Sequence, residues 1–389
     1  MKIILVHNYY MSKGGEDRTF ALEADLLRRN GHAVLEYTDT NLRVKNLSGI
    51  NAAIQTIWSE YSKRRLLKLL KQFKPDIAHF HNTFLLISPS AYYACMETGV
   101  PVVQTLHNYR LFCPSAIFFR DGNLCEDCIG KTFPWPGIWH ACFYNSRNKT
   151  AVVAAMLTVH RFLKTWNNQV NAYIAPTDFF RRKLIKCGLP EDRIFIKPNF
   201  IYPDPGINNE AGCYALFVGR ISSEKGVRTI IEAWRRINSI PLRIVGEGPL
   251  SAKFKQYVNR MNIKNLEFLD SKSKEEVLLL MKMAKFLIIP SEWYECLPTV
   301  IVEAFSCGVP VITSRLGAMA EIVEDKKTGL LFAPGDSEDL ADKVQWAWNH
   351  PEEMKSMGKE ARKEYEAKYT AEKNYQILMD IYQKAEDFV

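Results

Sequence analysis

The sequence predicts an α/β protein with two parallel sheets, each covered by helices on both faces. The chain of 389 residues is too long for one hydrophobic core, so two domains are expected. In both halves short apolar segments alternate with segments of helical periodicity, as they do in parallel sheets. Residues 200–213 between the halves are rich in Pro, Gly and Asn. We therefore expect domains at 1–200 and 201–370, and a helix at 371–389 that crosses back to the first domain.

The first half contains five expected strands, which are short apolar runs bounded by turn residues. They lie at residues 3–7, 34–37, 77–81, 102–107 and 172–176. Amphipathic patterns between them predict helices at residues 20–30, 62–73, 152–166 and 178–186.

The second half shows the same alternation of expected strands and helices. Strands are expected at residues 214–219, 242–245, 266–268, 286–290 and 309–313, with helical patterns between them. Ligands of such sheets bind beyond the carboxyl ends of the strands. Two doubly wound, Rossmann-like domains that face each other would place this site in a central cleft.

Residues 290–314 are the most informative segment. The apolar run before Pro290 predicts a buried strand that enters a loop. Glu295 then lies in the loop, and Glu303 follows eight residues later in an expected helix. Pro298 suits the first helical turn, and free backbone N–H groups over 296–299 would form an anion site. Two acids beside an anion site indicate a nucleotide-linked ligand.

Glycine-containing loops follow three expected strands. Gly14 and Gly15 come after the first strand and would let a phosphate or a sugar approach the backbone, although a plain turn is an alternative. Arg220 and Lys225 lie in the segment 219–226, where two cations could hold a diphosphate. The segment 246–249, which includes Gly246 and Glu247, suggests a pocket for a base or a ribose.

The spacing of Glu295 and Glu303 argues against a glycosidase. Eight residues of helix rise about 12 Å, whereas paired glycosidase carboxyl groups lie roughly 5–9.5 Å apart. Each acid is better suited to accepting hydrogen bonds from hydroxyl groups.

These motifs together resemble the retaining glycosyltransferases of family 4, which have the GT-B fold. The resemblance rests on Glu295 and Glu303, on Arg220 and Lys225, and on the segment 329–336, and it extends over essentially the whole chain. It implies that Arg220 and Lys225 hold the donor diphosphate and that Glu303 binds the ribose.

The resemblance also implies roles for other residues. Glu295 would orient the transferred sugar, with help from the loop made of Cys296, Leu297, Pro298 and Thr299. Gly15 would close over the diphosphate, and His107 matches the family's active-site histidine. The chain departs from the family at 296–298, where relatives usually carry two glycines and where Pro298 removes one amide.

The reaction implied by this resemblance transfers a hexose or N-acetylhexosamine from a UDP- or GDP-sugar to a saccharide, and a lipid-linked saccharide is the expected acceptor. It retains the anomeric configuration through a front-face displacement, in which the leaving phosphate accepts the acceptor's proton. Surface polysaccharides such as lipopolysaccharide or capsule are the expected products. The sequence contains no Asp-x-Asp metal motif, so no cofactor is expected for catalysis.

Four of the nine cysteines fall within thirty residues. Cys125 and Cys128 form a Cys-x-x-Cys core between Cys113 and Cys142. Four thiolates at such spacing can hold a structural zinc ion. The alternative, that the four thiols simply pack an inserted loop over residues 113–142, stays open.

The charge distribution suggests an anionic partner. The net charge is +8, and residues 1–200 carry 26 Lys and Arg against 15 Asp and Glu. Residues 133–140 contain two Trp and a Phe, and residues 63–74 combine basic and leucine faces. Both segments suit a membrane surface, although the leucines could instead pack against the sheet.

The expected location is the cytoplasm, peripheral at the inner face of the plasma membrane. No apolar run approaches the ~20 residues that span a bilayer, and the first residues lack the features of a signal peptide.

Two rival functions belong to other classes. A sugar-nucleotide epimerase shares the two-domain fold but would need an acid and a base at the sugar. A non-catalytic basic protein would bind nucleic acid or act as a scaffold, but the sequence contains no nucleic-acid motif.

Overall fold

The chain folds into two compact units, each built on a parallel sheet. The computed structural model describes residues 1–389 except 12–13, 208–211 and 389. Unit 1 comprises residues 1–118, 125–198 and 374–389, and unit 2 comprises residues 119–124 and 199–373.

Among the described residues, the sheet of unit 1 has six parallel strands in the order β2-β1-β3-β4-β7-β8. In chain order they are β1 (Lys2–Tyr9), β2 (Ala33–Thr40), β3 (Ile77–Asn82), β4 (Val102–Thr105), β7 (Ala172–Ala175) and β8 (Ile194–Ile196). The pairing of β1 with β2 runs in register from Lys2 opposite Ala33 to Tyr9 opposite Thr40. Because all the strands are parallel, the loops that follow them share one edge of the sheet.

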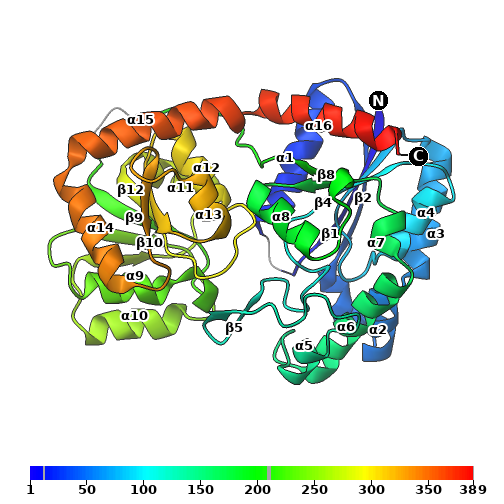
Figure 1. Ribbon diagram of the computed structural model, residues 1–389, viewed down its shortest axis with the longest axis horizontal. Coiled ribbons are helices and arrows are strands. Elements are labelled where there is room, and N and C mark those ends of the chain that lie inside the picture. The colour runs from blue at the N-terminus through cyan, green and yellow to red at the C-terminus, as the bar shows by residue number, and fades with distance from the viewer. Residues whose placement is uncertain (12–13, 208–211, 389) are drawn as a thin grey trace. The chain divides into compact units, whose positions relative to one another are not determined.

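The described part of unit 1 contains nine helices. They are α1 (Gly15–Arg29), α2 (Gly49–Ile57), α3 (Glu60–Phe73), α4 (Ser90–Met96), α5 (Trp135–Trp139), α6 (Arg147–Phe162), α7 (Thr165–Asn168), α8 (Asp178–Lys186) and α16 (Ala371–Glu386). Phe20 and Leu27 of α1 and Leu378 and Tyr382 of α16 form one buried cluster with strand residues such as Leu5. This cluster fixes α1 and α16 on one face of the sheet (Figure 1).

The sheet of unit 2 repeats this design with the order β11-β10-β9-β12-β13-β14. Its strands are β9 (Tyr214–Val218), β10 (Leu242–Val245), β11 (Leu266–Leu269), β12 (Ala284–Ile289), β13 (Val311–Ser314) and β14 (Gly329–Phe332). Its helices are α9 (Val227–Trp234), α10 (Ser251–Arg260), α11 (Lys274–Lys282), α12 (Thr299–Ser306), α13 (Gly317–Ile322), α14 (Ser337–Asn349) and α15 (Pro351–Lys368).

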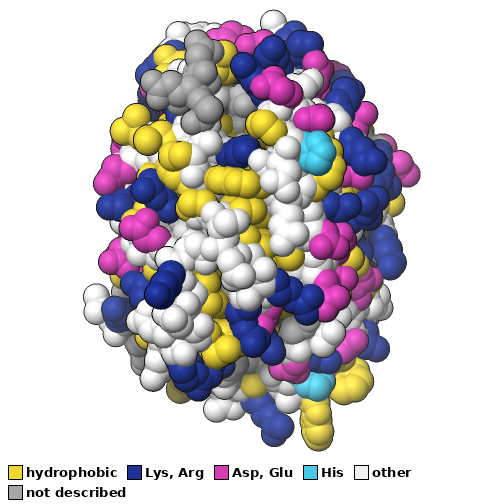
Figure 2. All heavy atoms as spheres, turned by 90° about the vertical axis from the view of Figure 1, so that its left-hand side faces the viewer, with side chains coloured by type: hydrophobic (Ala, Val, Ile, Leu, Met, Phe, Trp, Pro, Cys, Tyr) yellow, Lys and Arg dark blue, Asp and Glu magenta, His cyan; other side chains and the backbone are white. Residues whose placement is uncertain are grey.

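The core of unit 2 is centred on the buried Trp234, which packs with Phe254, Phe286 and Leu340. Figure 2 shows the side of the molecule that carries these unit 2 helices, where acidic and basic side chains are interspersed. This mixture agrees with the small net charge of residues 201–389, which carry 25 Lys and Arg against 28 Asp and Glu.

The segment after β4 has little regular structure. It contains the antiparallel hairpin of β5 (Phe119–Arg120) and β6 (Asn123–Leu124), and then the short helix α5. Across the described part of the chain, no helix combines the length and the apolar character needed to cross a bilayer.

The structure differs from the expected elements in several respects. α1 begins at Gly15 instead of residue 20, and α6 spans Arg147–Phe162 instead of 152–166. The strand predicted over 102–107 ends at Thr105, so His107 lies in the loop that follows. β5, β6, β8 and β14 were not predicted. The first three have only two or three residues, too few to show a period of two. Leu66 and Leu70 of α3 are buried, so these leucines pack inside unit 1 instead of facing a membrane.

Candidate functional site

Three loops of unit 2 meet at the carboxyl ends of β9, β10 and β12. Backbone hydrogen bonds tie the first two loops together, from Ile221 N–H to Glu247 O (3.0 Å) and from Leu250 N–H to Ile221 O (3.1 Å). The third loop joins them through the bond from Glu292 N–H to Glu224 O (2.9 Å). The side chains of these loops are therefore held at one edge of the sheet.

Two glycines are required by the close packing of these loops. Gly226 has a φ of +65°, and a Cβ there would lie 1.9 Å from Pro290 O. Gly246 has a φ of +131°, and a Cβ there would lie 2.1 Å from Gly219 O. Only glycine fits both the backbone conformation and the space at these positions. The packing of the loops therefore explains why Gly226 and Gly246 are glycines, and no bound ligand is needed to explain them.

Glu295 and Lys225 form an ion pair at this edge. Glu295 is 5% exposed, and its Oε1 lies 2.6 Å from Lys225 Nζ. Ser291 Oγ donates to the same oxygen at 2.8 Å, and Lys225 Nζ lies 5.3 Å from the ring centre of Trp293. The sequence predicted Lys225 and Glu295 as site residues with separate roles, whereas Ser291 and Trp293 were missed.

Glu303 has a cationic partner that the sequence did not reveal. It is 6% exposed on α12 and forms an ion pair with Lys274, the first residue of α11. The other predicted residues of these loops, Arg220 and Glu247, are exposed. Unit 2 thus presents two buried carboxylates, each held by a lysine.

The start of α12 lies one residue later than expected. Pro298 is the N-cap residue, α12 begins at Thr299, and Pro298 O accepts from Ile301 N–H at 2.9 Å. Cys296 and Leu297 are buried just before it. The first N–H groups of a helix lack partners within the helix. Pro298 precedes this first turn, so its missing N–H does not reduce the number of free N–H groups there.

Gly14 and Gly15 lie at the start of α1 in unit 1. Gly14 is the N-cap residue, and its N–H donates to Asp17 Oδ2 at 3.0 Å. Both glycines are exposed, and a Cβ on either would meet no atom of the described residues within 4 Å. In contrast to Gly226 and Gly246, no packing within the chain requires glycine here.

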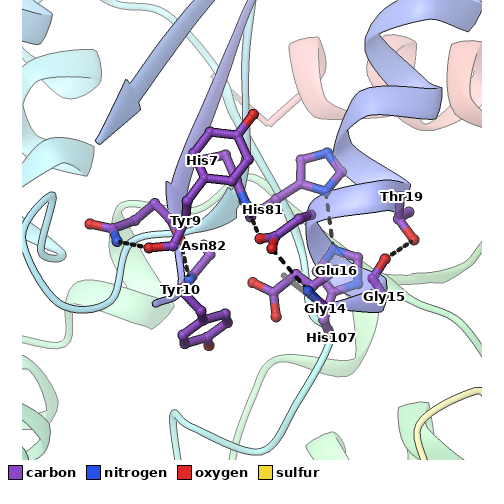
Figure 3. A network of polar contacts seen from close by, with 12 residues as sticks. His7, Tyr9, Tyr10, Gly14, Gly15, Glu16, Thr19, His81, Asn82 and His107 are labelled. Atoms are coloured by element: carbon purple, nitrogen blue, oxygen red, sulfur yellow. Dashed lines mark hydrogen bonds and ion pairs between the residues drawn. The ribbon is translucent and has the colours of Figure 1, made fainter. Parts of the chain in front are cut away.

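His107 lies two residues after β4 and contacts a second histidine. Its Nε2 is 3.0 Å from Nδ1 of His81, which lies on β3. The neighbouring Asn108 donates from Nδ2 to Glu16 Oε2 at 3.2 Å, which connects this loop with the start of α1. Figure 3 shows His81 and His107 together with Gly14, Gly15 and Glu16.

A buried polar cluster continues from His81 into the core of unit 1. Glu23 Oε1 lies 3.3 Å from His81 Nε2 and 3.0 Å from His79 Nδ1, and Glu23 Oε2 lies 2.7 Å from Lys197 Nζ. His79 Nε2 also bonds Thr105 Oγ1 at 2.8 Å. All of these side chains are at least 97% buried. The sequence placed both histidines on a strand but gave no sign of their partners.

Glu23, His79 and His81 could in principle hold a metal ion. Their ligand atoms lie within 4.8 Å of one another, and they are the only such group of three among the residues that the structure describes. Lys197 already supplies a positive charge to Glu23 at 2.7 Å. A buried ammonium repels a cation, so the cluster is an ion pair with two imidazoles.

The four clustered cysteines lie in the segment between β4 and α6. Cys113 and Cys128 are buried, and Cys125 and Cys142 are half-buried. Burial, with a further contribution from the other three thiols, raises the pKa of Cys128 to about 12. Among the described residues, the four cysteines do not form a group with all sulfur atoms within 4.8 Å of one another.

Comparisons with known proteins place both units in glycosyltransferase families. Residues 14–204 match the family described as "Glycosyltransferase Family 4", and residues 204–364 match "Glycosyl transferases group 1".

Curated relatives carry names of the same kind. An uncharacterized glycosyltransferase of Methanocaldococcus jannaschii is 34% identical over 53% of this chain and 58% of its own length. The D-rhamnosyltransferase WbpZ of Pseudomonas aeruginosa is 25% identical over 65% of this chain and 72% of its own. The O-antigen chain mannosyltransferase C of Escherichia coli is 25% identical over 43% of this chain and 46% of its own.

Solved structures match almost the entire chain. HepE of Anabaena in complex with UDP aligns with a TM-score of 0.71 over 98% of this chain and 99% of its own, at 15% identity. The same protein in complex with UDP-glucose aligns with a TM-score of 0.70 over 98% of this chain and all of its own, at 16% identity. At this identity the likeness concerns the fold.

Proposed function

The chain belongs to the group 1 glycosyltransferases of family 4 and has the GT-B fold, and from this we propose that it transfers a sugar from a nucleoside-diphosphate sugar to a saccharide acceptor. One observation carries the proposal: Glu295 and Glu303 are buried among the loops at the carboxyl ends of the unit 2 strands, each paired with a lysine. Buried carboxylates surrounded by cations suit a ligand that combines hydroxyl groups with a diphosphate.

The donor's charged groups would meet positive charge at this edge. Arg220 and Lys225 would bind the diphosphate, together with the N–H groups at the start of α12. Glu303 would accept hydrogen bonds from the ribose hydroxyl groups, and the Gly246–Glu247 turn would adjoin the base.

The proposed reaction exchanges one bond at the anomeric carbon. The bond from C1 to the phosphate oxygen breaks while the acceptor oxygen bonds to C1 from the same face, which retains the configuration. The proton of the acceptor hydroxyl passes to the leaving phosphate oxygen. Glu295 would orient the sugar, and Lys225 and the helix start would stabilise the charge that develops on the phosphate. His107 would hydrogen-bond the transferred sugar.

The proposed substrates are a UDP- or GDP-linked hexose or N-acetylhexosamine and a saccharide that is linked to a lipid. The solved complexes of HepE with UDP and UDP-glucose support a nucleotide-sugar donor. The O-antigen chain mannosyltransferase among the relatives supports a role in the synthesis of surface polysaccharides.

A membrane partner is supported by the surface around α5 and α6. Between Asp127 and Asp178 the chain carries five Lys or Arg and no acidic residue. Trp135 is 55% exposed, Trp139 is 64% exposed and Phe162, at the end of α6, is 83% exposed. Arg161 links α6 to the segment before α5 by donating to Lys131 O at 2.5 Å.

We call the exposed residues Phe133, Trp135, Trp139 and Phe162, with the basic residues of 128–177, the aromatic–basic surface. Exposed aromatic rings beside Lys and Arg are typical of protein surfaces that bind the interface of an anionic bilayer. We therefore propose peripheral binding to anionic membranes through this surface, which would bring the enzyme to a lipid-linked acceptor.

The experiment that tests the transferase proposal is a panel of UDP- and GDP-sugars, scored by thermal shift and by donor turnover. We expect one sugar nucleotide to stabilise the wild type and to turn over, and Glu303→Ala to lose both. Stabilisation by none of the donors would contradict the proposal and would favour a non-catalytic binding protein. Conversion of the donor to an epimer without transfer would favour an epimerase.

A further inference from the structure

His107 is the outermost of four side chains that contact one another in sequence and reach the core of unit 1. His107 contacts His81 at 3.0 Å, His81 lies 3.3 Å from Glu23, and Glu23 pairs with Lys197 at 2.7 Å. These residues come from the loop after β4, from β3, from α1 and from the segment after β8. His107 is half-buried, whereas the other three are buried. Figure 3 shows the outer two of these side chains, His81 and His107.

The charge of Glu23 is fixed by its surroundings. Burial alone would raise the pKa of Glu23, but Lys197 and the neighbouring imidazoles outweigh it and hold the pKa well below its usual value. Burial lowers the pKa of His81 to about 4 and lowers that of His107 well below its usual value. Near pH 7, Glu23 is therefore an acceptor, and the imidazoles of His81 and His107 are neutral with one N–H each.

These states determine which nitrogen of each ring carries the proton. The contact of Glu23 Oε1 with His81 Nε2 at 3.3 Å is an electrostatic contact without hydrogen-bond geometry. A lone pair on Nε2 would repel the carboxylate, so the proton of His81 belongs on Nε2. His81 Nδ1 is then an acceptor, and the contact with His107 Nε2 requires the proton of His107 on that nitrogen. The remaining nitrogen of His107, Nδ1, carries a lone pair.

We infer that Glu23 is a positioning residue which acts through His81 to hold His107 in the tautomer with a bare Nδ1. The consequence for the reaction rests on the proposed function. If the protein is a glycosyltransferase, His107 Nδ1 would accept a hydrogen bond from a hydroxyl group of the transferred sugar. A neutral acceptor selects a hydroxyl or an amide N–H over a carboxylate. The site would therefore take neutral sugars and reject uronic acids at the group that faces His107.

The tautomer can be measured without any substrate. Long-range ¹H–¹⁵N correlation spectra of the protein labelled with ¹⁵N-histidine distinguish the two tautomers of each ring, and His107→Asn identifies the His107 signals. We expect His107 to carry its proton on Nε2 in the wild type. A proton on Nδ1 would overturn the inference, whether or not the protein proves to be a glycosyltransferase.

Three variants separate positioning from stability. Glu23→Met with Lys197→Met replaces the ion pair by apolar side chains of similar size, a change that buried pairs often tolerate. We expect it to leave His107 as a mixture of tautomers. Glu23→Gln with Lys197→Met supplies an amide oxygen as acceptor and should restore the single tautomer. His79→Gln removes the other imidazole beside Glu23. His79 is not one of the residues that connect Glu23 with His107, so this variant should leave the His107 tautomer unchanged.

The same variants have a kinetic signature. The double Met variant should lose about 10- to 100-fold in kcat, as is typical when a partner that orients a functional histidine is removed. The Gln–Met variant should recover most of this loss. Nucleotide binding, which the proposed function assigns to unit 2, should be unchanged in all three and serves as the folding control. An unchanged tautomer in the double Met variant, with nucleotide binding intact, would overturn the inference.

Discussion

Lys225 Nζ and Glu295 Oε1 lie 2.6 Å apart, so the cation assigned to the donor diphosphate is bound to the carboxylate assigned to the donor sugar. Lys225 is one-quarter exposed, whereas the Glu295 carboxyl group is almost buried. In the proposed reaction the two must act on different groups of the donor. Donor binding would therefore exchange an internal ion pair for contacts of both residues with the ligand.

The first prediction concerns this pair. Glu295→Gln should lower kcat by about 10²- to 10³-fold, a loss typical for removal of one stabilising group. It should leave UDP or GDP binding equal or tighter, because Lys225 loses a competing carboxylate. Lys225→Ala should weaken nucleotide binding. Titration calorimetry and initial rates measure both effects.

The control for that experiment is Glu292→Gln on the same loop. Glu292 accepts from Thr229 at 2.6 Å and is not assigned to the donor. A similar loss of kcat in Glu292→Gln would show that the loop is merely sensitive to substitution.

The second prediction separates fold from function at Gly15. A Cβ on Gly15 meets no atom within 4 Å, and Gly15 is the first residue of α1. Gly15→Ala should therefore leave the free energy of unfolding unchanged or raise it by up to about 1 kcal/mol. If a ligand approaches this backbone, the same variant should lose transferase activity.

Gly49→Ala is the matched control for Gly15. Gly49 is likewise the first residue of a helix, α2, with open space around a Cβ. Equal activity of the two alanine variants would contradict a role for Gly15 in ligand binding.

The third prediction is a pH dependence of stability that arises from Glu16. Burial, with a smaller contribution from Asp17, raises its pKa from 4.5 to about 8. The folded protein then retains a proton that the unfolded chain has released, so Glu16 stabilises the fold at low pH. This contribution is lost as the pH rises from about 4.5 to 8, with a slope of at most about 1.4 kcal/mol per pH unit.

Urea unfolding at pH 5, 6, 7 and 8 tests this dependence. The unfolding free energy of the wild type should fall relative to that of Glu16→Gln, which cannot release a proton. Parallel curves for the two proteins would show that Glu16 does not titrate in this range.

The fourth prediction is a zinc ion bound by Cys113, Cys125, Cys128 and Cys142. We propose that binding draws the four thiolates into a tetrahedron around the metal. Elemental analysis of the purified protein should find one zinc ion per chain, and Cys125→Ser or Cys128→Ser should lower this value. Cys187→Ser, a half-buried cysteine outside the group, should keep the zinc. Metal-free protein with unchanged stability would favour the alternative of four packed thiols.

The fifth prediction concerns the aromatic–basic surface. Binding to vesicles that contain phosphatidylglycerol should fall when Trp135 and Trp139 are both replaced by Ser, because both rings are more than half exposed. Binding should also weaken at high salt, since basic residues contribute about 1 kcal/mol each at an anionic surface. Co-sedimentation measures both effects.

Leu279→Ser is the control for the membrane experiment. Leu279 is 63% exposed but lies on α11 of unit 2. An equal loss of vesicle binding in this variant, or none in the tryptophan variant, would contradict the proposed surface.

Local patterns in the sequence were sufficient for most elements and for the unit 2 motifs. The segment with Glu295 and Glu303 was identified because a strand, a loop and a helix follow one another without interruption. β5, β6 and β8 were missed because two or three residues carry too little periodicity. Lys274 was missed because its partner Glu303 lies 29 residues further along the chain, and no local pattern connects the two.

The sequence by itself determined the alternation of strands and helices and the approximate positions of most of them, because these follow from short-range periodicity and turn chemistry. Only the tertiary structure decided which of these residues meet. Glu23 and Lys197 are 174 residues apart in the chain, yet they form one buried pair. The physical reason is the strand order of unit 1, which brings α1, β3, β4 and the segment after β8 to a single polar cluster. Contacts over such separations depend on the packing of whole elements, which no local pattern records.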